Sequence, residues 1–206
     1  MSYYHMYPSS INERYLEQIV ELLRRGGTVV YPTDTLYAIG CDALNNRAVE
    51  RVCRIRDINP AKQRLSMVCD DISQASEFAR IDNNAFRIIR DNTPGPFTFI
   101  LPASTSLAKQ FKGRKEVGVR IPANEIARRI ARELGSPLLS ATATWPEAED
   151  EQLIHPEEVM ARFDGAVDAF IDAGQVPEPA APSAVVSLID SSQPEIIREG
   201  PLPLSL

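Results

Sequence analysis

The order of apolar runs and amphipathic segments is the feature that most constrains the fold of this chain. Runs rich in β-branched and other apolar residues predict strands at 28–31, 65–69, 97–101, 117–121, 137–142, 167–171, 184–189 and 195–198. Helical periodicity predicts helices at 12–25, 46–56, 73–79, 83–91, 124–134 and 156–163. Because several strands follow one another without an intervening helix, we predict an α/β fold with a twisted, mixed parallel and antiparallel sheet and flanking helices.

Length and composition predict a single domain spanning residues 1–206. The chain is 44% hydrophobic and 24% charged, which is typical of a globular protein with one sizeable core. No apolar stretch is long enough to cross a membrane, and the first residues lack a secretory signal pattern. We therefore expect a cytoplasmic protein that does not associate with membranes.

The three cysteines, Cys41, Cys53 and Cys69, form no CxxC pair and are expected to be reduced, buried packing residues. His5 and His155 lie far from them in sequence and have no motif around them. The sequence therefore predicts no zinc site and no resident metal.

Charge is unevenly distributed along the chain. The net charge of −6 argues against a protein that coats nucleic acid through bulk charge. Basic residues nevertheless concentrate within 51–64 and 109–115, whereas 147–158 is acidic. A basic pocket on an acidic protein suits a small polyanionic ligand.

The strand predicted at 28–31 ends at Pro32 and is followed by Thr33, Asp34 and Thr35. A strand that ends in a loop with hydroxyl and carboxylate side chains often lines a small-molecule site, although an ordinary turn has the same composition. Asp34 could approach a magnesium ion, but a surface carboxylate in a turn is the simpler interpretation.

Four further groups could meet this loop in one cleft. They are the basic loop with Arg56, Lys62 and Arg64, the strand residue Arg120, the run Ser140, Thr142 and Thr144, and the late residues Ser183 and Arg198. Arg120 either points to solvent or faces a concave surface, where its guanidinium would bind a carboxylate or phosphate. The basic loop could instead be a solvated surface, and the SATAT run could be the edge of a strand. Trp145 could either cover an adenine ring or be an ordinary loop residue.

The chain lacks a glycine-rich phosphate loop of the GxGxxG or GxxxxGK type. If a nucleotide binds, basic side chains and hydroxyls must therefore hold its phosphates.

Seven segments, taken in order, resemble the YrdC/YciO family, and most closely its YciO branch. They are GGTVVYPTDTLYAIGCDA, ERVCRIRDINPAKQRLSMVC, NTPGPFTFIL, VGVRIP, PLLSATAT, PSAVVSLID and IIREG. The resemblance implies a twisted α/β sheet with a basic concave face. It also implies the synthesis of threonylcarbamoyl-adenylate from L-threonine, bicarbonate and ATP, with release of pyrophosphate, for tRNA modification.

The resemblance further implies roles for single residues. Thr33, Thr35, Arg120 and Thr142 would bind the substrate, with Arg120 on the carboxylate of the amino acid. The nucleotide would be bound by Arg56, Lys62, Arg64, Thr144, Ser183 and Arg198. Mg²⁺ would accompany ATP, because hard cations pair with phosphate oxygens.

This chain departs from the synthase pattern at three places, one of which is Val68, near the point where some members of the family have a histidine. The other two lie in the basic loop and in the SATAT run. Arg56 stands where synthases have a lysine, with Ile58 or Asn59 at the arginine two positions further on, and Thr142 and Thr144 replace a Ser-x-Asn pair. Three interpretations therefore remain: a threonylcarbamoyl-adenylate synthase-like nucleotidyltransferase, a non-catalytic tRNA- or double-stranded-RNA-binding protein, and an enzyme that hydrolyses carbamoyl adenylates.

Overall fold

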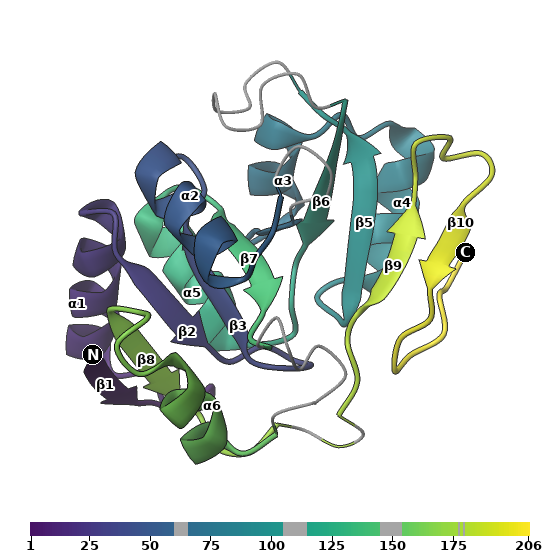
Figure 1. Cartoon of the computed structure of the whole chain (residues 1–206). Coiled ribbons are helices and arrows are strands. Elements are labelled where there is room, and N and C mark those ends of the chain that lie inside the picture. Colours follow the sequence, from purple (N-terminus) through teal and green to yellow (C-terminus); the bar gives the residue numbers. More distant parts are fainter. Residues whose placement is uncertain (60–65, 105–114, 145–153, 177, 179) are drawn as a thin grey trace.

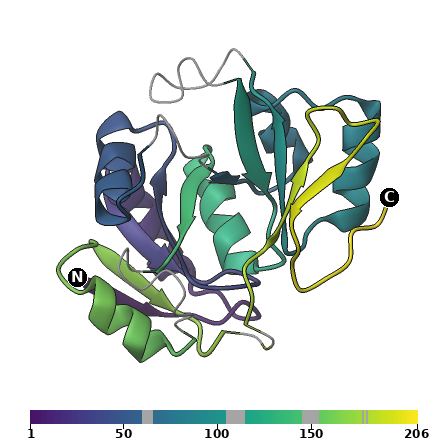
Figure 2. The same cartoon turned by 45° about the vertical axis from the view of Figure 1, so that its right-hand side comes forward.

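The computed structural model describes residues 1–59, 66–104, 115–144, 154–176, 178 and 180–206, and these form a single mixed α/β domain. Ten strands build one sheet in the order β1-β8-β2-β3-β7-β4-β6-β5-β9-β10. The two ends of the sheet, β1–β8 and β9–β10, lie on opposite sides of the molecule (Figures 1 and 2). The predicted α/β fold is confirmed.

The strands are β1 (Ser2–His5), β2 (Thr28–Tyr31), β3 (Ala38–Asp42), β4 (Ser66–Val68), β5 (Phe97–Pro102), β6 (Glu116–Arg120), β7 (Leu138–Thr142), β8 (Ala169–Asp172), β9 (Ala184–Ser187) and β10 (Glu195–Arg198). Four neighbouring pairs are parallel and five are antiparallel. This mixture confirms the inference drawn from consecutive strands without helices between them.

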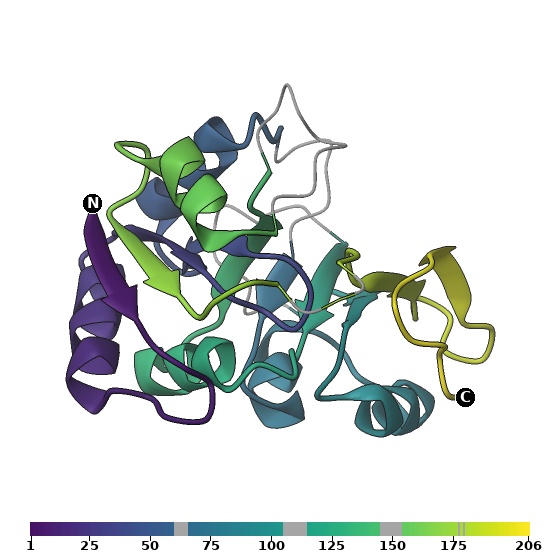
Figure 3. The same cartoon turned by 90° about the horizontal axis from the view of Figure 1, so that it is seen from below.

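The helices are α1 (Glu13–Arg24), α2 (Asn46–Ile55), α3 (Ile72–Phe78), α4 (Asn83–Asn92), α5 (Glu125–Leu134) and α6 (Pro156–Phe163). Helices α1, α3, α4 and α5 gather on one side of the sheet, whereas α2 and α6 lie on the other (Figure 3). None of these helices in the described part of the chain is long and apolar enough to cross a membrane.

Local signals explain where the helices begin and end. An asparagine or aspartate side chain accepts a hydrogen bond from the third residue of five of the helices, as Asn12 does from the Tyr15 amide at α1. Gly26 has φ +86° just after α1, as predicted for the residue that ends this helix.

Two strands were not predicted. β1 lies at the start of the chain and pairs in parallel with β8, and β3 lies between Pro32 and the helix predicted at 46–56. Gly40 in the middle of β3 weakens the strand signal, because glycine disfavours strands. The fold nevertheless requires a residue without a side chain here, since a Cβ would lie 2.4 Å from the Leu139 carbonyl oxygen and 2.9 Å from Cε1 of Tyr31.

The core consists of two apolar clusters. The smaller cluster contains side chains of α1 and α5 with residues of β1, β2 and β8, and the larger one contains side chains of the other four helices. Cys41, Cys53 and Cys69 are buried within the larger cluster, which confirms their packing role. Burial is the main cause that raises the pKa of the Cys41 and Cys69 thiols, so both are protonated at neutral pH.

Candidate functional site

A cavity of about 250 Å³ opens among the central strands of the sheet. Its walls come from β3 to β7, from β9 and from the end of β10, together with the turn that links β2 to β3. The polar side chains in its lining are those of Thr35, Tyr37, Ser66, Thr98, Arg120, Ser140, Thr142, Ser183 and Arg198. Five of these nine residues belong to the site set expected from sequence, so distant segments converge as predicted.

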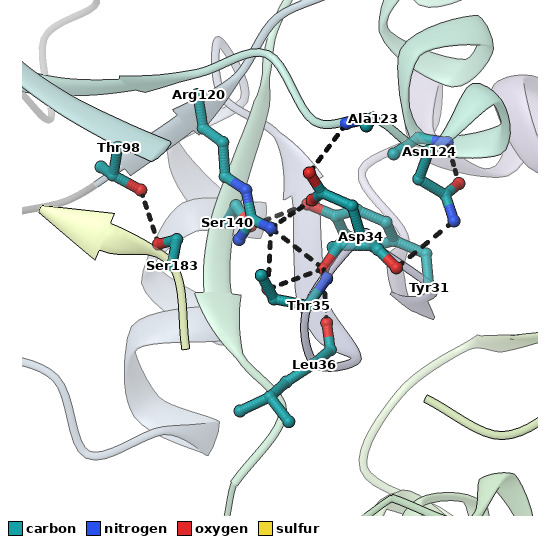
Figure 4. Close-up of polar contacts among 12 residues, drawn as sticks. Tyr31, Asp34, Thr35, Leu36, Thr98, Arg120, Ala123, Asn124, Ser140 and Ser183 are labelled. Carbon is teal, nitrogen blue, oxygen red and sulfur yellow. Dashed lines mark hydrogen bonds and ion pairs between the residues drawn. The ribbon is translucent and has the colours of Figure 1, made fainter. Parts of the chain in front are cut away.

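Arg120 at the end of β6 is held against the turn after β2 (Figure 4). Its Nη2 donates to Oγ1 of Thr35 at 2.7 Å and to Oγ1 of Thr33 at 3.2 Å, and it forms an ion pair with Oδ1 of Asp34. The Arg120 side chain is 11% exposed. The interpretation of Arg120 as a solvent-facing residue is therefore wrong, and the alternative that it faces the concave surface is confirmed.

Asp34 connects this turn to the start of α5. Its Oδ2 accepts a hydrogen bond from the Ala123 amide at 2.9 Å, while Oδ1 faces Arg120 (Figure 4). The side chain is only 9% exposed. The expectation of a surface carboxylate at Asp34 is thus wrong, because β3 folds back beside β2 and carries the turn inward against β6.

Hydrogen bonds within the turn orient the two threonines. Thr33 donates from Oγ1 to the Leu36 carbonyl at 2.6 Å and accepts from the Thr35 amide at 3.1 Å. Both side chains are buried. Their hydroxyl oxygens are thereby directed toward Arg120 rather than toward solvent.

Arg198 on β10 lines the same cavity and has neutral partners. Its Nε and Nη2 donate to the Ser183 carbonyl at 3.0 and 2.8 Å, and the Ser183 hydroxyl lies 2.9 Å from Oγ1 of Thr98. Partial burial is the first cause that lowers the pKa of Arg198, and the positive charge of Arg120 is the second. An anion between these two guanidinium groups would offset their repulsion.

The altered synthase positions contact one another. Arg56, just beyond the end of α2, is buried, and its Nη1 donates to the backbone carbonyl of Thr144. Neither residue belongs to the lining of the cavity, whereas Thr142 does. Lys62, Arg64 and Trp145 lie outside the described residues.

Sequence reasoning missed Tyr31 as a residue of the site. Its side chain is fully buried, and its hydroxyl donates to Oγ of Ser140 at 2.8 Å. Ser140 was noted within SATAT but was not included in the site set. The available signal was a tyrosine at the end of an apolar run, because a buried phenol requires a hydrogen-bond partner.

Among the residues that the structure describes, no group of three or more His, Cys, Asp or Glu side chains could hold an ion. His5 instead contacts the carboxylate of Asp172, with Nδ1 3.3 Å from Oδ2. The arrangement as a whole provides two cationic side chains and several hydroxyls, which suits an anionic ligand rich in oxygen atoms.

Comparisons with known proteins agree with this fold. The Sua5/YciO/YrdC family model, whose description reads "Telomere recombination", matches residues 21–200. The chain is 36% identical to the uncharacterized protein YciO of Escherichia coli K12 over 96% of this chain and 95% of that protein. An uncharacterized protein of Haemophilus influenzae is 38% identical, with the same coverage of both chains.

Solved structures show the same relationship. The crystal structure of E. coli YciO matches with a TM-score of 0.89 and 35% identity over 98% of both chains. P. abyssi Sua5 complexed with L-threonine matches with a TM-score of 0.85 and 26% identity, covering 98% of this chain and 58% of that one.

Proposed function

Since this chain belongs to the Sua5/YciO/YrdC family, we propose that its cavity forms an adenylate from L-threonine, bicarbonate and ATP. The observation that carries the proposal is that two arginines, Arg120 and Arg198, line one cavity together with several hydroxyls. The structural likeness to a Sua5 complexed with L-threonine supports the amino acid as one ligand.

In this proposal, the carboxylate of threonine binds at Arg120 beside Thr33, Thr35 and Thr142. The phosphates of ATP lie toward Arg198 and Ser183, and Mg²⁺ enters bound to ATP as part of the substrate. Both carboxylate oxygens of Asp34 already have partners, so this residue is unsuited to bind the ion. The nucleotide roles proposed for Arg56, Lys62, Arg64 and Thr144 rest on the family resemblance, because Arg56 and Thr144 lie outside the cavity lining and the other two outside the described residues.

The chemistry consists of positioning and charge neutralisation. The threonine amine and bicarbonate form a carbamate with loss of water, and a carbamate oxygen then attacks the α-phosphorus of ATP. The bond to the bridging oxygen breaks, and pyrophosphate leaves with the electron pair. Arg198 offsets the charge that develops on this leaving group, without a covalent intermediate on the enzyme. The product would supply tRNA threonylcarbamoyl-adenosine modification.

The test measures pyrophosphate release with purified protein, Mg²⁺, ATP, bicarbonate and L-threonine, leaving out one component at a time. Mass detection identifies the adenylate. We expect release only with all three substrates, and its loss in Arg120→Ala. Arg129→Ala is the matched control, because Arg129 is also an ion-paired arginine of low exposure but lies on α5 outside the cavity lining. Release that continues without L-threonine would contradict the proposal.

A second candidate reaction is hydrolysis of a carbamoyl adenylate. It is favoured by Arg56, which contacts the Thr144 backbone and does not belong to the cavity lining. Release of AMP from prepared threonylcarbamoyl-adenylate, without pyrophosphate release from ATP, would support this candidate. Binding of tRNA that weakens steeply with salt, without either reaction, would favour an RNA-binding protein.

A further inference from the structure

Strand β1 forms the outer edge of the sheet, at the end opposite to β10, and does not belong to the cavity lining (Figure 3). Among the described residues it pairs with β8 alone, in parallel. The amide of Met6, just after the strand, donates to the Asp172 carbonyl at 2.9 Å, and that of Ser2 also donates to a carbonyl beside β8. Because alternate residues of a strand bond to opposite sides, Tyr3 and His5 direct their backbone N–H and C=O groups toward the free edge.

The two free edges of the sheet differ in the features that prevent further pairing. In β10 the register shifts between Ile196 and Arg198, and the strand has a charged residue at each end, Glu195 and Arg198. Bulges, charges and prolines are the usual protection of an edge strand. The register of β1 is regular over Ser2–His5, and the strand contains no proline, lysine, arginine, aspartate or glutamate. The edge of β1 is therefore open to a further strand.

One face of β1 carries a row of exposed rings. Tyr3, His5 and Tyr7 alternate with the buried residues Tyr4 and Met6. Tyr3 and Tyr7 are each 52% exposed, and the rings of His5 and Tyr7 meet edge to face with centroids 4.7 Å apart. Tyrosine is enriched where proteins bind one another, because its ring is apolar and its hydroxyl tolerates water. On an added strand, alternate side chains would lie beside these rings.

Carboxylates lie close to the same rings. The Tyr3 hydroxyl donates to the Asp172 carboxylate, and Nδ1 of His5 lies 3.3 Å from an oxygen of that group. The hydrogen bond to Asp172 is the main cause that raises the pKa of Tyr3 to about 12, and the negative charge of Glu157 at the start of α6 also contributes. Aromatic faces combined with negative charge attract lysine and arginine side chains. The same charge disfavours nucleic acid and a second copy of this edge.

We propose that the free edge of β1 binds an extended, lysine- or arginine-rich segment of another protein by strand addition. The segment pairs through its backbone with Tyr3 and His5, and its cationic side chains lie over the rings of Tyr3 and Tyr7. This surface lies at the other end of the sheet from the cavity, and it is independent of the reaction proposed there.

The probe is a short fluorescent peptide of alternating lysine and valine, whose binding is measured by anisotropy. We expect saturable binding that weakens as salt is raised. Tyr7→Ser should weaken it about tenfold, because an aromatic contact is lost, and Glu157→Gln about threefold. Tyr15→Ser and Glu17→Gln are the matched controls. Tyr15 is also an exposed tyrosine in edge-to-face contact with a ring of β1, that of Tyr4, and Glu17 is an exposed carboxylate on α1.

A second peptide separates strand addition from attraction by charge alone. The same sequence methylated on every backbone nitrogen keeps its charges but cannot donate to a strand, so it should bind at least about tenfold more weakly. The unmodified peptide should also slow hydrogen exchange of the Tyr3 and His5 amides.

Several results would overturn this proposal. They are the absence of binding by the lysine peptide, equal binding of the methylated peptide, and unchanged exchange at Tyr3 and His5. Tighter binding of a single-stranded RNA oligomer would instead indicate a nucleic-acid surface. A dimer in sedimentation experiments that Tyr7→Ser dissociates would show that a second copy occupies the edge.

Discussion

Two arginines line the cavity, one on the wall formed by β6 and the other on the wall formed by β10, and they have different partners. Arg120 has a carboxylate partner, Asp34, and both side chains are about nine-tenths buried. Arg198 donates to the Ser183 carbonyl, a neutral group, and its residue is exposed on the last strand. The charge of Arg120 is therefore neutralised by a buried ion pair that stabilises the fold, whereas Arg198 provides net positive charge at the cavity. The difference indicates that stability depends mainly on the Arg120 wall, and phosphate binding mainly on the Arg198 wall.

The largest expected effect is on the Arg120 wall. Asp34→Ala leaves a buried guanidinium without its counter-ion and should lower the free energy of unfolding by about 3 kcal/mol or more. Urea denaturation measures this change. Glu21→Ala, which removes the exposed partner of Arg25 on α1, should change stability much less.

A double mutant sharpens this prediction. Removing both charges, in Asp34→Ala with Arg120→Ala, should cost less than the sum of the single substitutions, because no buried charge remains unpaired. A loss in Asp34→Ala no greater than in Glu21→Ala would contradict the structural role of the pair.

Arg198→Gln should weaken ligand binding and leave stability nearly unchanged, the reverse of Asp34→Ala. We expect the dissociation constant for MgATP to rise about tenfold, because one charge-assisted contact to phosphate is lost, while the unfolding free energy changes little. Calorimetric titration and urea denaturation measure the two quantities. Arg24→Gln is a matched control, since Arg24 also donates to a backbone carbonyl, that of Glu133, but lies on α1. Large destabilisation with unchanged MgATP affinity would reverse the comparison.

The smallest effect is expected at Ser183. Ser183→Ala keeps the backbone carbonyl that accepts the two shorter bonds from Arg198, and loses the hydroxyl at 3.5 Å from Nη2 and its bond with Thr98. MgATP affinity should therefore fall only about threefold. An effect as large as that of Arg198→Gln would show that the hydroxyl itself carries most of the binding on this wall.

Residues that carry a local signal were predicted well. The amphipathic pattern at 12–25 and the cap at Gly26 correspond to α1, and the apolar run 97–101 corresponds to β5. The family resemblance brought Thr35, Arg120, Thr142, Ser183 and Arg198 into one site, and the structure places all five on one cavity. The assignment of each to amino acid or nucleotide stays a prediction.

Residues whose partners lie far away in sequence were predicted poorly. Asp34 resembled a turn residue because its partners, Arg120 and the Ala123 amide, are more than eighty positions away. Tyr31 resembled an ordinary strand residue because its partner is 109 positions away. Strand β3 was overlooked because Gly40 weakens its local pattern, although that glycine makes room for the Tyr31 ring.

The sequence by itself determined the order of strands and helices, the family, and most of the polar residues that could form a site. These properties follow from local periodicity, capping and motif order, which neighbouring residues encode. Only the tertiary structure decided which arginine is neutralised, that Arg56 bonds to a backbone carbonyl, and that Tyr31 donates to Ser140. Each of these depends on how the strands align beside one another, because alignment decides which side chains from distant segments come within hydrogen-bonding distance.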